Sequence, residues 1–337
     1  MSDAAESTDT AYSISVDNLS KMYGGFRALD AISFEVEPGE IVGFLGPNGA
    51  GKTTTMKILT CFMAATSGSA EVAGFDVYTE FDEVRRRVGY LPENVPLYDE
   101  MLVYDYLHFI AEVREVAPAR REQRIERVVD LTGLHDVVGR EISELSKGYR
   151  QRVGLAQAII HEPDVLILDE PTTGLDPNQI VEIRDVITQI GEEKTIIFST
   201  HILQEVTAVC DRIIIINRGD IVADGTLAEL EDAVAETNPG LLVEFAPEAD
   251  ANQIRELLEG LPGAQAVKPA DRRPGQVAFR IETGDEDRVR SALLKSEGDE
   301  GHGLTSLTRA EPTLEDIFRV YTDGSTEEAQ DAARRAS

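Results

Sequence analysis

The stretch from Gly46 to Thr54, GPNGAGKTT, has the residue types and the spacing of a phosphate-binding loop. Glycines let the backbone curl so that successive N–H groups point at phosphate oxygens, and the helix expected next presents its positive end. Lys52 would bridge the outer phosphates, and the Thr53 hydroxyl would ligate Mg²⁺. The residues expected to bind the nucleotide are Gly46, Pro47, Asn48, Gly49, Ala50, Gly51, Lys52, Thr53 and Thr54.

A second stretch, VLILDE, ends in two carboxylates, Asp169 and Glu170. At the carboxyl end of an apolar strand, Asp169 can hold Mg²⁺ through water, and Glu170 can polarise a water for attack on the γ-phosphate. The alternative is a solvated strand end without chemistry. With a phosphate loop upstream, the pair of motifs favours hydrolysis of a nucleoside triphosphate.

Several short apolar stretches would position these residues. Residues 39–46 form a buried strand that runs into the loop, and a helix is expected over 53–62. DVLILD and TIIFST are typical of strands inside a parallel sheet. Helical periodicity extends over residues 103–138, with breaks near Pro118 and Gly133, and DRIIIINRGDIVADGT predicts a hairpin turning at Asn217–Asp220. The fold class is therefore α/β.

The pattern changes after residue 240. Strands are expected at 241–245, 264–268, 276–281 and 304–307, with helices at 251–261, 286–297 and 313–321. The first six elements follow the order β-α-β-β-α-β of a small split βαβ sandwich. We therefore expect a disordered N-terminus (1–12), an ATPase domain (13–237), a small α+β domain (241–322) and a polar tail (323–337).

The charge is strongly negative: 62 acids against 32 bases give −30. Such a surface repels nucleic acid phosphates, so no nucleic acid partner is expected. At molar salt the screening length falls to roughly 3 Å, which nearly removes self-repulsion. Because the acids are spread along the chain, we favour adaptation to a high-salt, halophile cytoplasm over an ordinary acidic protein.

The remaining composition predicts a cytoplasmic protein. The apolar runs, such as Ile213–Ile216, are far shorter than the roughly 20 residues that span a bilayer. The first residues, MSDAAESTDTAYS, lack the basic start and apolar stretch of a signal peptide. Two cysteines, Cys61 and Cys210, do not make a disulfide framework.

The motifs GPNGAGKTT, YLPE, LSKGYRQR, ILDEPTTGLD and STH follow one another in the order found in ABC transporter ATPase subunits. Over residues 14–237 the chain resembles that family, and its signature resembles those of drug-export and gliding-motility ABC ATPases. The resemblance implies an ABC-type P-loop core with antiparallel β and helical subdomains, and ATP and Mg²⁺ as ligands. A C-terminal stretch, EPTLEDIFRVYT, resembles the last helix of drug-export ATPases and favours export over import.

The resemblance also implies roles for residues outside the two first motifs. Tyr23 would stack on adenine, and His201 would reach the γ-phosphate and help to hold the attacking water. Glu93, where the family usually has glutamine, would ligate Mg²⁺. Asp176 would belong to a loop that passes between two subunits.

The signature LSKGY departs from the usual LSGGQ. In the family, its serine and glycine contact the ATP that the opposite subunit holds. Ser146 would cap a helix whose start offers free N–H groups to a phosphate, and Gly148 would allow close approach. Lys147 and Tyr149 remove no phosphate donor, so we interpret the sequence as a working variant.

A signature that acts in trans implies two ATPase subunits with ATP between them. We expect a homodimer, with a relative as the second subunit the open alternative. The protein driven by ATP hydrolysis would be a separately encoded membrane permease, docked near residues 94–107. This would place the chain on the inner face of the membrane. The competing hypothesis is a soluble ABC ATPase of the ribosome or of DNA repair. The interval between Lys52 and Ser146 is too short for the long coiled coil of repair types, and NRGD at Asn217 is a poor base reader for a GTPase.

Overall fold

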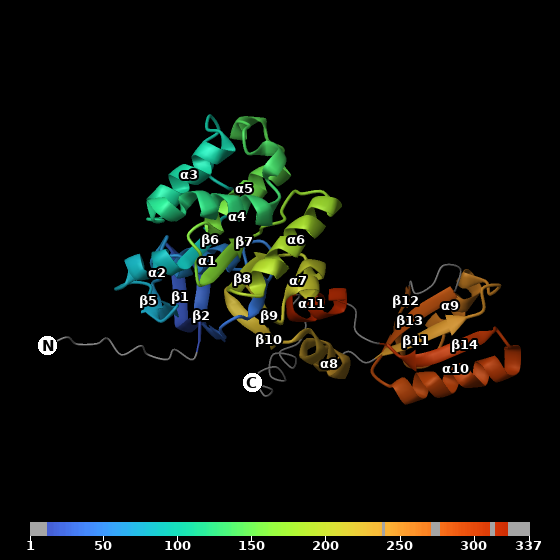
Figure 1. Cartoon of the computed structure of the whole chain (residues 1–337). Coiled ribbons are helices and arrows are strands. Elements are labelled where there is room, and N and C mark those ends of the chain that lie inside the picture. Colours follow the sequence, from blue (N-terminus) through green and yellow to red (C-terminus); the bar gives the residue numbers. More distant parts are fainter. Residues whose placement is uncertain (1–11, 238–239, 271–276, 311–313, 323–337) are drawn as a thin grey trace. The chain divides into compact units, whose positions relative to one another are not determined.

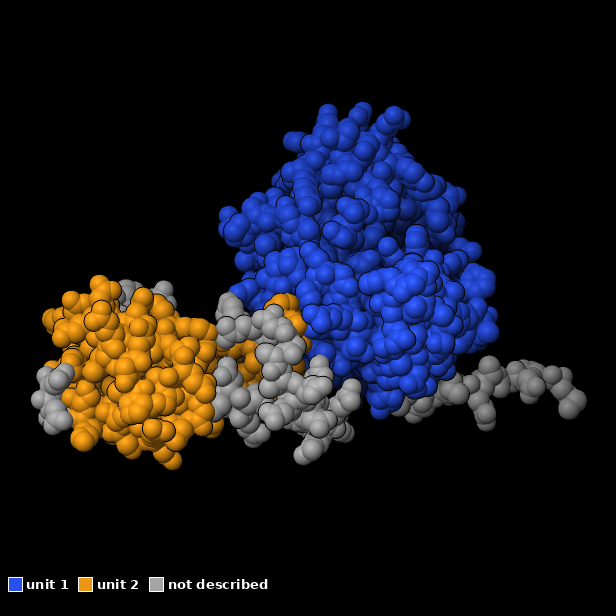
Figure 2. Space-filling model, turned by 180° about the vertical axis from the view of Figure 1, so that it is seen from behind, with its two compact units in different colours: residues 1–226 blue, residues 227–337 orange. Residues whose placement is uncertain are grey.

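The computed structural model describes residues 12–237, 240–270, 277–310 and 314–322. The expected disordered N-terminus, apart from Tyr12, and the polar tail at 323–337 lie outside these ranges. The chain divides into two compact units, residues 1–226 and 227–337 (Figure 2). Among the described residues, no helix combines the length and the apolar character that crossing a membrane requires.

Unit 1 is built around a six-stranded sheet with the order β10-β9-β3-β8-β7-β6. Neighbouring strands from β9 to β6 are parallel, and β10 pairs antiparallel with β9. Asp220 lies opposite Asn217, which confirms the predicted hairpin. The strands are β3 (Ile41–Leu45), β6 (Val88–Leu91), β7 (Val165–Asp169), β8 (Thr195–Thr200), β9 (Arg212–Asn217) and β10 (Asp220–Gly225).

Both faces of this sheet are covered, which explains its nearly continuous apolar strands. One face carries Val165 and Ile167 into a core with α1 (Lys52–Leu59) and an antiparallel sheet of order β2-β1-β4-β5. The opposite face carries Leu166 and Leu168 into a second core that includes residues of α5 and α6. The covering elements are β1 (Ile14–Tyr23), β2 (Phe26–Val36), β4 (Ser67–Val72), β5 (Phe75–Asp76), α5 (Lys147–Ile159), α6 (Pro177–Gly191) and α7 (Leu203–Val209).

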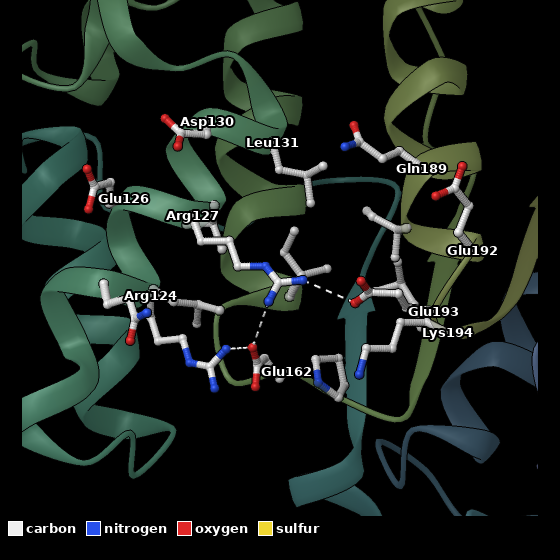
Figure 3. A pocket seen from close by; sticks show the side chains of 17 residues that line it. Arg124, Glu126, Arg127, Asp130, Leu131, Glu162, Gln189, Glu192, Glu193 and Lys194 are labelled. Atoms are coloured by element: carbon white, nitrogen blue, oxygen red, sulfur yellow. Dashed lines mark hydrogen bonds and ion pairs between the residues drawn. The ribbon is translucent and has the colours of Figure 1, made fainter.

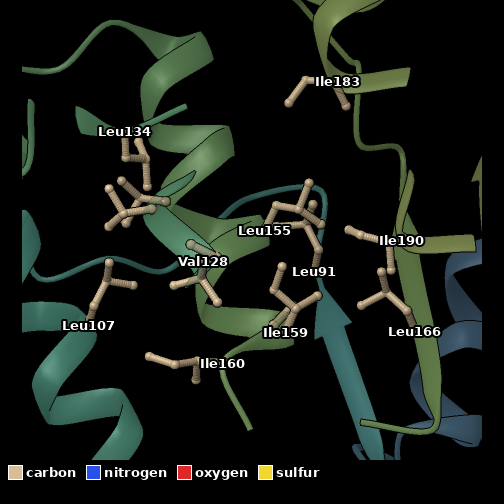
Figure 4. Packing of buried hydrophobic residues seen from close by; sticks show 14 of the residues in the cluster. Leu91, Leu107, Val128, Leu134, Leu155, Ile159, Ile160, Leu166, Ile183 and Ile190 are labelled. Carbon is tan, nitrogen blue, oxygen red and sulfur yellow. The ribbon is translucent and has the colours of Figure 1, made fainter. Parts of the chain in front are cut away.

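Helices α3 (Val103–Val113), α4 (Arg121–Thr132) and α5 gather in a separate helical layer (Figure 1). Leu107 of α3, Val128 of α4 and Leu155 of α5 share one core with Leu166 of β7 (Figure 4). A helix break at Pro118 and a left-handed cap at Gly133 confirm the predicted interruptions. Helix α2 (Phe81–Arg87) was not predicted, because it buries a single residue, Val84.

Unit 2 has a four-stranded antiparallel sheet of order β12-β13-β11-β14. Its core joins Val243 and Phe245 of β11 to Ile254 of α9 and Leu293 of α10. The elements are α8 (Leu227–Thr237), β11 (Gly240–Phe245), α9 (Ala251–Glu259), β12 (Ala264–Pro269), β13 (Val277–Thr283), α10 (Glu286–Glu300), β14 (Leu304–Arg309) and α11 (Leu314–Thr322). The predicted β-α-β-β-α-β order is present, and α8 is an addition that the sequence pattern did not predict.

Helix α11 is attached to this sheet by a buried ion pair. A guanidinium nitrogen of Arg280, on β13, lies 2.8 Å from a carboxylate oxygen of Asp316, and both side chains are buried. Removing one partner of a buried ion pair is strongly destabilising. Asp316 of the LEDIF stretch therefore has a structural role in unit 2.

Candidate nucleotide site

The phosphate loop joins the end of β3 to the start of α1. Gly51, the residue before the helix, has φ 121°, and a Cβ there would come within 2.7 Å of the Leu29 side chain, so only glycine fits. The Lys52 side chain is buried and donates to the carbonyl oxygens of Gly46, at 2.7 Å, and Pro47, at 3.3 Å. The lysine thus folds back over its own loop.

Glu170 receives three groups on its carboxylate. Lys52 Nζ lies 3.2 Å from Oε1, with the two side chains only 5% and 8% exposed. On Oε2 converge His201 Nδ1, at 2.8 Å, and the hydroxyl of Thr173, which donates at 3.0 Å. The two Glu170 side-chain oxygens are therefore held by groups from three separate segments of the chain.

The backbone at Glu170 is unusual for a residue with a side chain, because φ is 51°. Its N–H donates to the carbonyl oxygen and to the hydroxyl of Ser199 on β8, each at 3.1 Å. These bonds hold the chain in the left-handed conformation as it leaves β7. Such strain persists only where the surroundings over-determine it.

Asp169 and Thr53 meet as the two motifs predicted, with the Thr53 hydroxyl 3.1 Å from Asp169 Oδ1. Ser199 donates to the same oxygen at 2.7 Å. Burial raises the pKa of Asp169; hydrogen bonds from Ser199 and Thr53 oppose this, whereas the nearby Glu170 and Glu93 carboxylates add to it. The described residues contain no group of three or more His, Cys, Asp or Glu placed to hold a metal ion by themselves.

A cavity of about 420 Å³ opens over these groups. It brings together most of the predicted residues: Tyr23, Asn48, Gly49, Gly51, Lys52, Thr53, Thr54, Glu93, Glu170 and His201. Thr173 and Phe26 also line it, and sequence reasoning missed both. Phe26 pairs with Tyr23 across the β1–β2 turn, and their 63% and 44% exposure leaves two aromatic rings open to solvent. An aromatic next to the YGG turn was the available signal for Phe26.

Comparisons with known proteins agree with this geometry. Residues 29–173 match the model of the family described as ABC transporter. The chain is 34% identical to the uncharacterized ABC transporter ATP-binding protein YdbJ of Bacillus subtilis, over 94% of this chain and 97% of YdbJ. The chain belongs to the ABC transporter ATP-binding proteins. It is the ATP-binding subunit of an ABC transporter and hydrolyses ATP.

Other similar ABC proteins have more specific names. The daunorubicin resistance ATP-binding protein DrrA3 of Streptomyces coeruleorubidus is 32% identical, over 96% of this chain and 99% of DrrA3. The linearmycin resistance ATP-binding protein LnrL of B. subtilis is 30% identical, over 92% of this chain and 98% of LnrL. A solved structure, that of cbiO1 from Clostridium perfringens, is also similar, and cbiO1 is part of the ABC transporter complex cbiONQ. It is 27% identical, with a TM-score of 0.61, and the match covers 67% of this chain and 94% of cbiO1. None of these names refers to gliding motility, which stays a prediction.

The signature of this ABC subunit lies apart from its own nucleotide cavity. Ser146 caps α5 by accepting a hydrogen bond from the N–H of Tyr149 at 3.4 Å, as predicted. Neither Ser146 nor Gly148 lines the 420 Å³ cavity. Asp176 is exposed and caps α6, accepting from the N–H groups of Asn178 and Gln179.

The variant residue Lys147 has a defined place. Its Nζ lies only 2.2 Å from where a Cβ on Gly174 would be, so glycine at 174 makes room for the lysine. Gly174 has φ 73° and belongs to the loop that connects Glu170 to Asp176. The signature and this loop therefore touch within one chain.

A second cavity, of about 490 Å³, lies among residues of α4, α5 and α6 (Figure 3). Arg127 crosses it and pairs with Glu162, at 3.2 Å, and Glu193, at 3.1 Å, while Arg124 also pairs with Glu162. These side chains already neutralise one another, and the cavity holds none of the predicted site residues. We assign it no ligand.

Proposed function

We propose that two copies of this ABC subunit close around two ATP molecules and power a separate membrane permease, working as an exporter. The single observation that carries the dimer is the separation of the signature from the cavity of its own chain. Ser146 is exposed at the start of α5, where unpaired N–H groups and the helix dipole favour a phosphate. That phosphate then comes from the partner subunit's cavity.

Within each cavity, the chain's own groups divide the work. Lys52 turns from Glu170 to the outer phosphates, and Tyr23 and Phe26 offer ring faces to the adenine. Glu170 then orients a water and accepts its proton, while His201, held through Nδ1, presents its other nitrogen toward the phosphate. Stabilising the charge on the transferred phosphoryl group is the main catalytic task of such a site.

Mg²⁺ fits the groups that are present. Thr53 and Asp169 offer hard oxygen atoms 3.1 Å apart, and Glu93 lies at the edge of the same cavity. Mg²⁺ is commonly held by one or two protein ligands together with substrate phosphates and waters, so a large protein cluster is not required. When bound, it would neutralise charge on the β- and γ-phosphates.

The permease would bind at a surface that we call the aromatic surface, defined by Phe62, Phe81, Tyr98, Phe109 and Val113. Tyr98 is 58% and Phe62 72% exposed, and the Tyr98 ring packs against Phe109 in a tilted arrangement, with 5.7 Å between ring centroids. Apolar groups this exposed favour a protein partner.

Two arginines connect the parts of this surface. Arg85 donates to the Cys61 carbonyl and lies over the Phe81 ring, and Arg114 donates to the Arg85 carbonyl at 2.8 Å. These contacts connect the end of α1, α2 and the end of α3, the elements along which much of the aromatic surface lies. It includes part of the 94–107 segment that the sequence predicted for docking, and it extends beyond it.

Export is supported by the resistance proteins DrrA3 and LnrL and by the LEDIF stretch. A chain that works on a permease lies against the inner face of the membrane. The charge of −30 supports a high-salt cytoplasm.

The test uses a tagged Glu170→Gln chain in a high-salt host, with membranes solubilised gently in Mg-ATP. We expect a membrane protein with several spans to co-purify in comparable amount. Tyr98→Asp with Val113→Asp should abolish that association, whereas Val181→Asp, an exposed valine of α6, should not. Co-purification of ribosomal or chromosomal proteins alone would instead support the soluble ABC alternative.

A further inference from the structure

We propose that Thr173 is a positioning residue for ATP hydrolysis, which orients the Glu170 carboxylate and acts through it. The inference rests on the proposed role of Glu170 and adds a residue that no motif assigned. Thr173 Oγ1 donates to Glu170 Oε2 at 3.0 Å. The same oxygen lies 2.8 Å from His201 Nδ1, so the hydroxyl and the imidazole share one carboxylate oxygen.

The backbone places this hydroxyl with little freedom. The N–H of Thr173 donates to the Glu170 carbonyl at 3.2 Å, and that of Leu175 donates to the Thr172 carbonyl at 3.1 Å, which forms two consecutive tight turns. Pro171, inside the first turn, fixes its own φ. The side chain at 173 is therefore directed back to the carboxylate three residues earlier.

Glu170 has a particular need for such a group. Its φ of 51° departs from the extended backbone of β7, which ends one residue earlier. Lys52 lies 3.2 Å from Oε1 and, in the proposed mechanism, would leave that oxygen on turning to the phosphates. After that move, Thr173 and His201 are the described groups that still hold the carboxylate, and of these two only Thr173 lies in the same turn as Glu170.

The position of Thr173 also connects the carboxylate to the subunit boundary. Gly174, the next residue, lies against Lys147 of the signature, and the loop continues to the exposed Asp176. A partner subunit that meets this loop would therefore contact the segment that carries the Thr173 hydroxyl. Thr173→Val removes that hydroxyl and keeps the branched shape, and Thr173→Ser keeps it.

The experiment measures kcat and KM for ATP and the dissociation constant for ADP in full-length chains. We expect Thr173→Val to lower kcat at least about tenfold with the ADP constant within about twofold, because misplacing a reacting group costs rate. Thr173→Ser should recover most of kcat. Thr132→Val, which removes a buried hydroxyl that only bonds its own helix, is the matched control for the loss of a threonine hydroxyl.

A double-mutant cycle decides whether Thr173 acts through Glu170. In a Glu170→Gln background, Thr173→Val should leave the residual rate unchanged within about twofold. An equal loss in that background, or a change confined to ADP binding, would overturn the proposal, since the hydroxyl would then act on the nucleotide itself. If Glu170→Gln alone keeps the wild-type rate, the proposed role of Glu170 fails, whatever Thr173 does.

Discussion

The ion pair between Lys52 and Glu170 predicts that nucleotide must compete with the protein for its own lysine. In Glu170→Gln the lysine loses its charged partner in the nucleotide-free state. The free protein should therefore be destabilised, and ADP should bind more tightly. ADP is the suitable probe because it reports binding to one subunit, separately from the ATP that would join two.

The magnitude follows from the geometry. Two unit charges 3.2 Å apart attract by about 5 kcal/mol at an effective dielectric constant of about 20. The low exposure of both side chains, 5% and 8%, means that water screens the pair little. Removing one partner of a buried pair typically costs about 3–5 kcal/mol. Because glutamine keeps a carbonyl oxygen for the lysine, we expect about 2 kcal/mol, which corresponds to roughly thirtyfold tighter ADP binding.

Isothermal titration with ADP at fixed KCl, in the absence of Mg²⁺, gives the dissociation constants, and urea unfolding at the same KCl gives the stability of the free protein. Glu93→Gln is the matched control, since it removes an equal charge from the same cavity but has no ion pair with Lys52. We expect less than about threefold tightening in that control. An ADP constant unchanged in Glu170→Gln, or tightened equally by Glu93→Gln, would refute the competition.

Three further outcomes are expected. The thermal unfolding midpoint should rise with KCl up to about 1 M and then level off, because screening removes the repulsion of a chain of charge −30; a flat profile would contradict the high-salt hypothesis. Lys147→Gly should raise the KM for ATP about two- to fivefold at low salt and less at molar KCl, since an exposed cation beside the signature would attract the partner's phosphates. Burial lowers the pKa of His161 from 6.5 to about 4. As pH falls, the unfolded chain therefore takes up the proton at a higher pH than the folded chain, and the free energy of unfolding decreases between pH 6.5 and pH 4. Relative to His161→Leu, whose unfolding should depend less on pH, the wild type should lose about 2 kcal/mol more between pH 7 and pH 5 in urea unfolding.

The sequence predicted those parts of the site that depend on local chemistry. The loop before Lys52 needs glycines wherever it occurs. An apolar strand that ends in two carboxylates can be recognised from its own residues, without knowing which strands lie beside it. Even the meeting of Thr53 with Asp169, 116 residues apart, could be expected, because Asp169 ends strand β7 and Thr53 begins the helix that follows the carboxyl end of β3 in the same parallel sheet.

What the sequence did not predict depends on how segments approach one another. Nothing in the sequence indicates that Lys52 forms an ion pair with Glu170, or that the Thr173 hydroxyl donates to the same carboxylate. Phe26 required the pairing of β1 with β2. Helix α2 escaped prediction because a helix that buries only Val84 has no apolar period to detect.

The contacts of Glu170 indicate how the proposed base would be released toward water. Lys52 donates to a carbonyl oxygen of its own loop and pairs with Glu170. The cation expected to bind phosphate and the proposed base therefore neutralise each other. In the proposed mechanism, arriving phosphates would draw the lysine away, and the carboxylate would then be released toward water while Thr173 and His201 keep its direction. The substrate that removes the lysine would also supply the phosphorus to be attacked, so the base would be released only when its target is present. Because Oε1 would be freed while Oε2 stays hydrogen-bonded, we expect Oε1 to orient the attacking water.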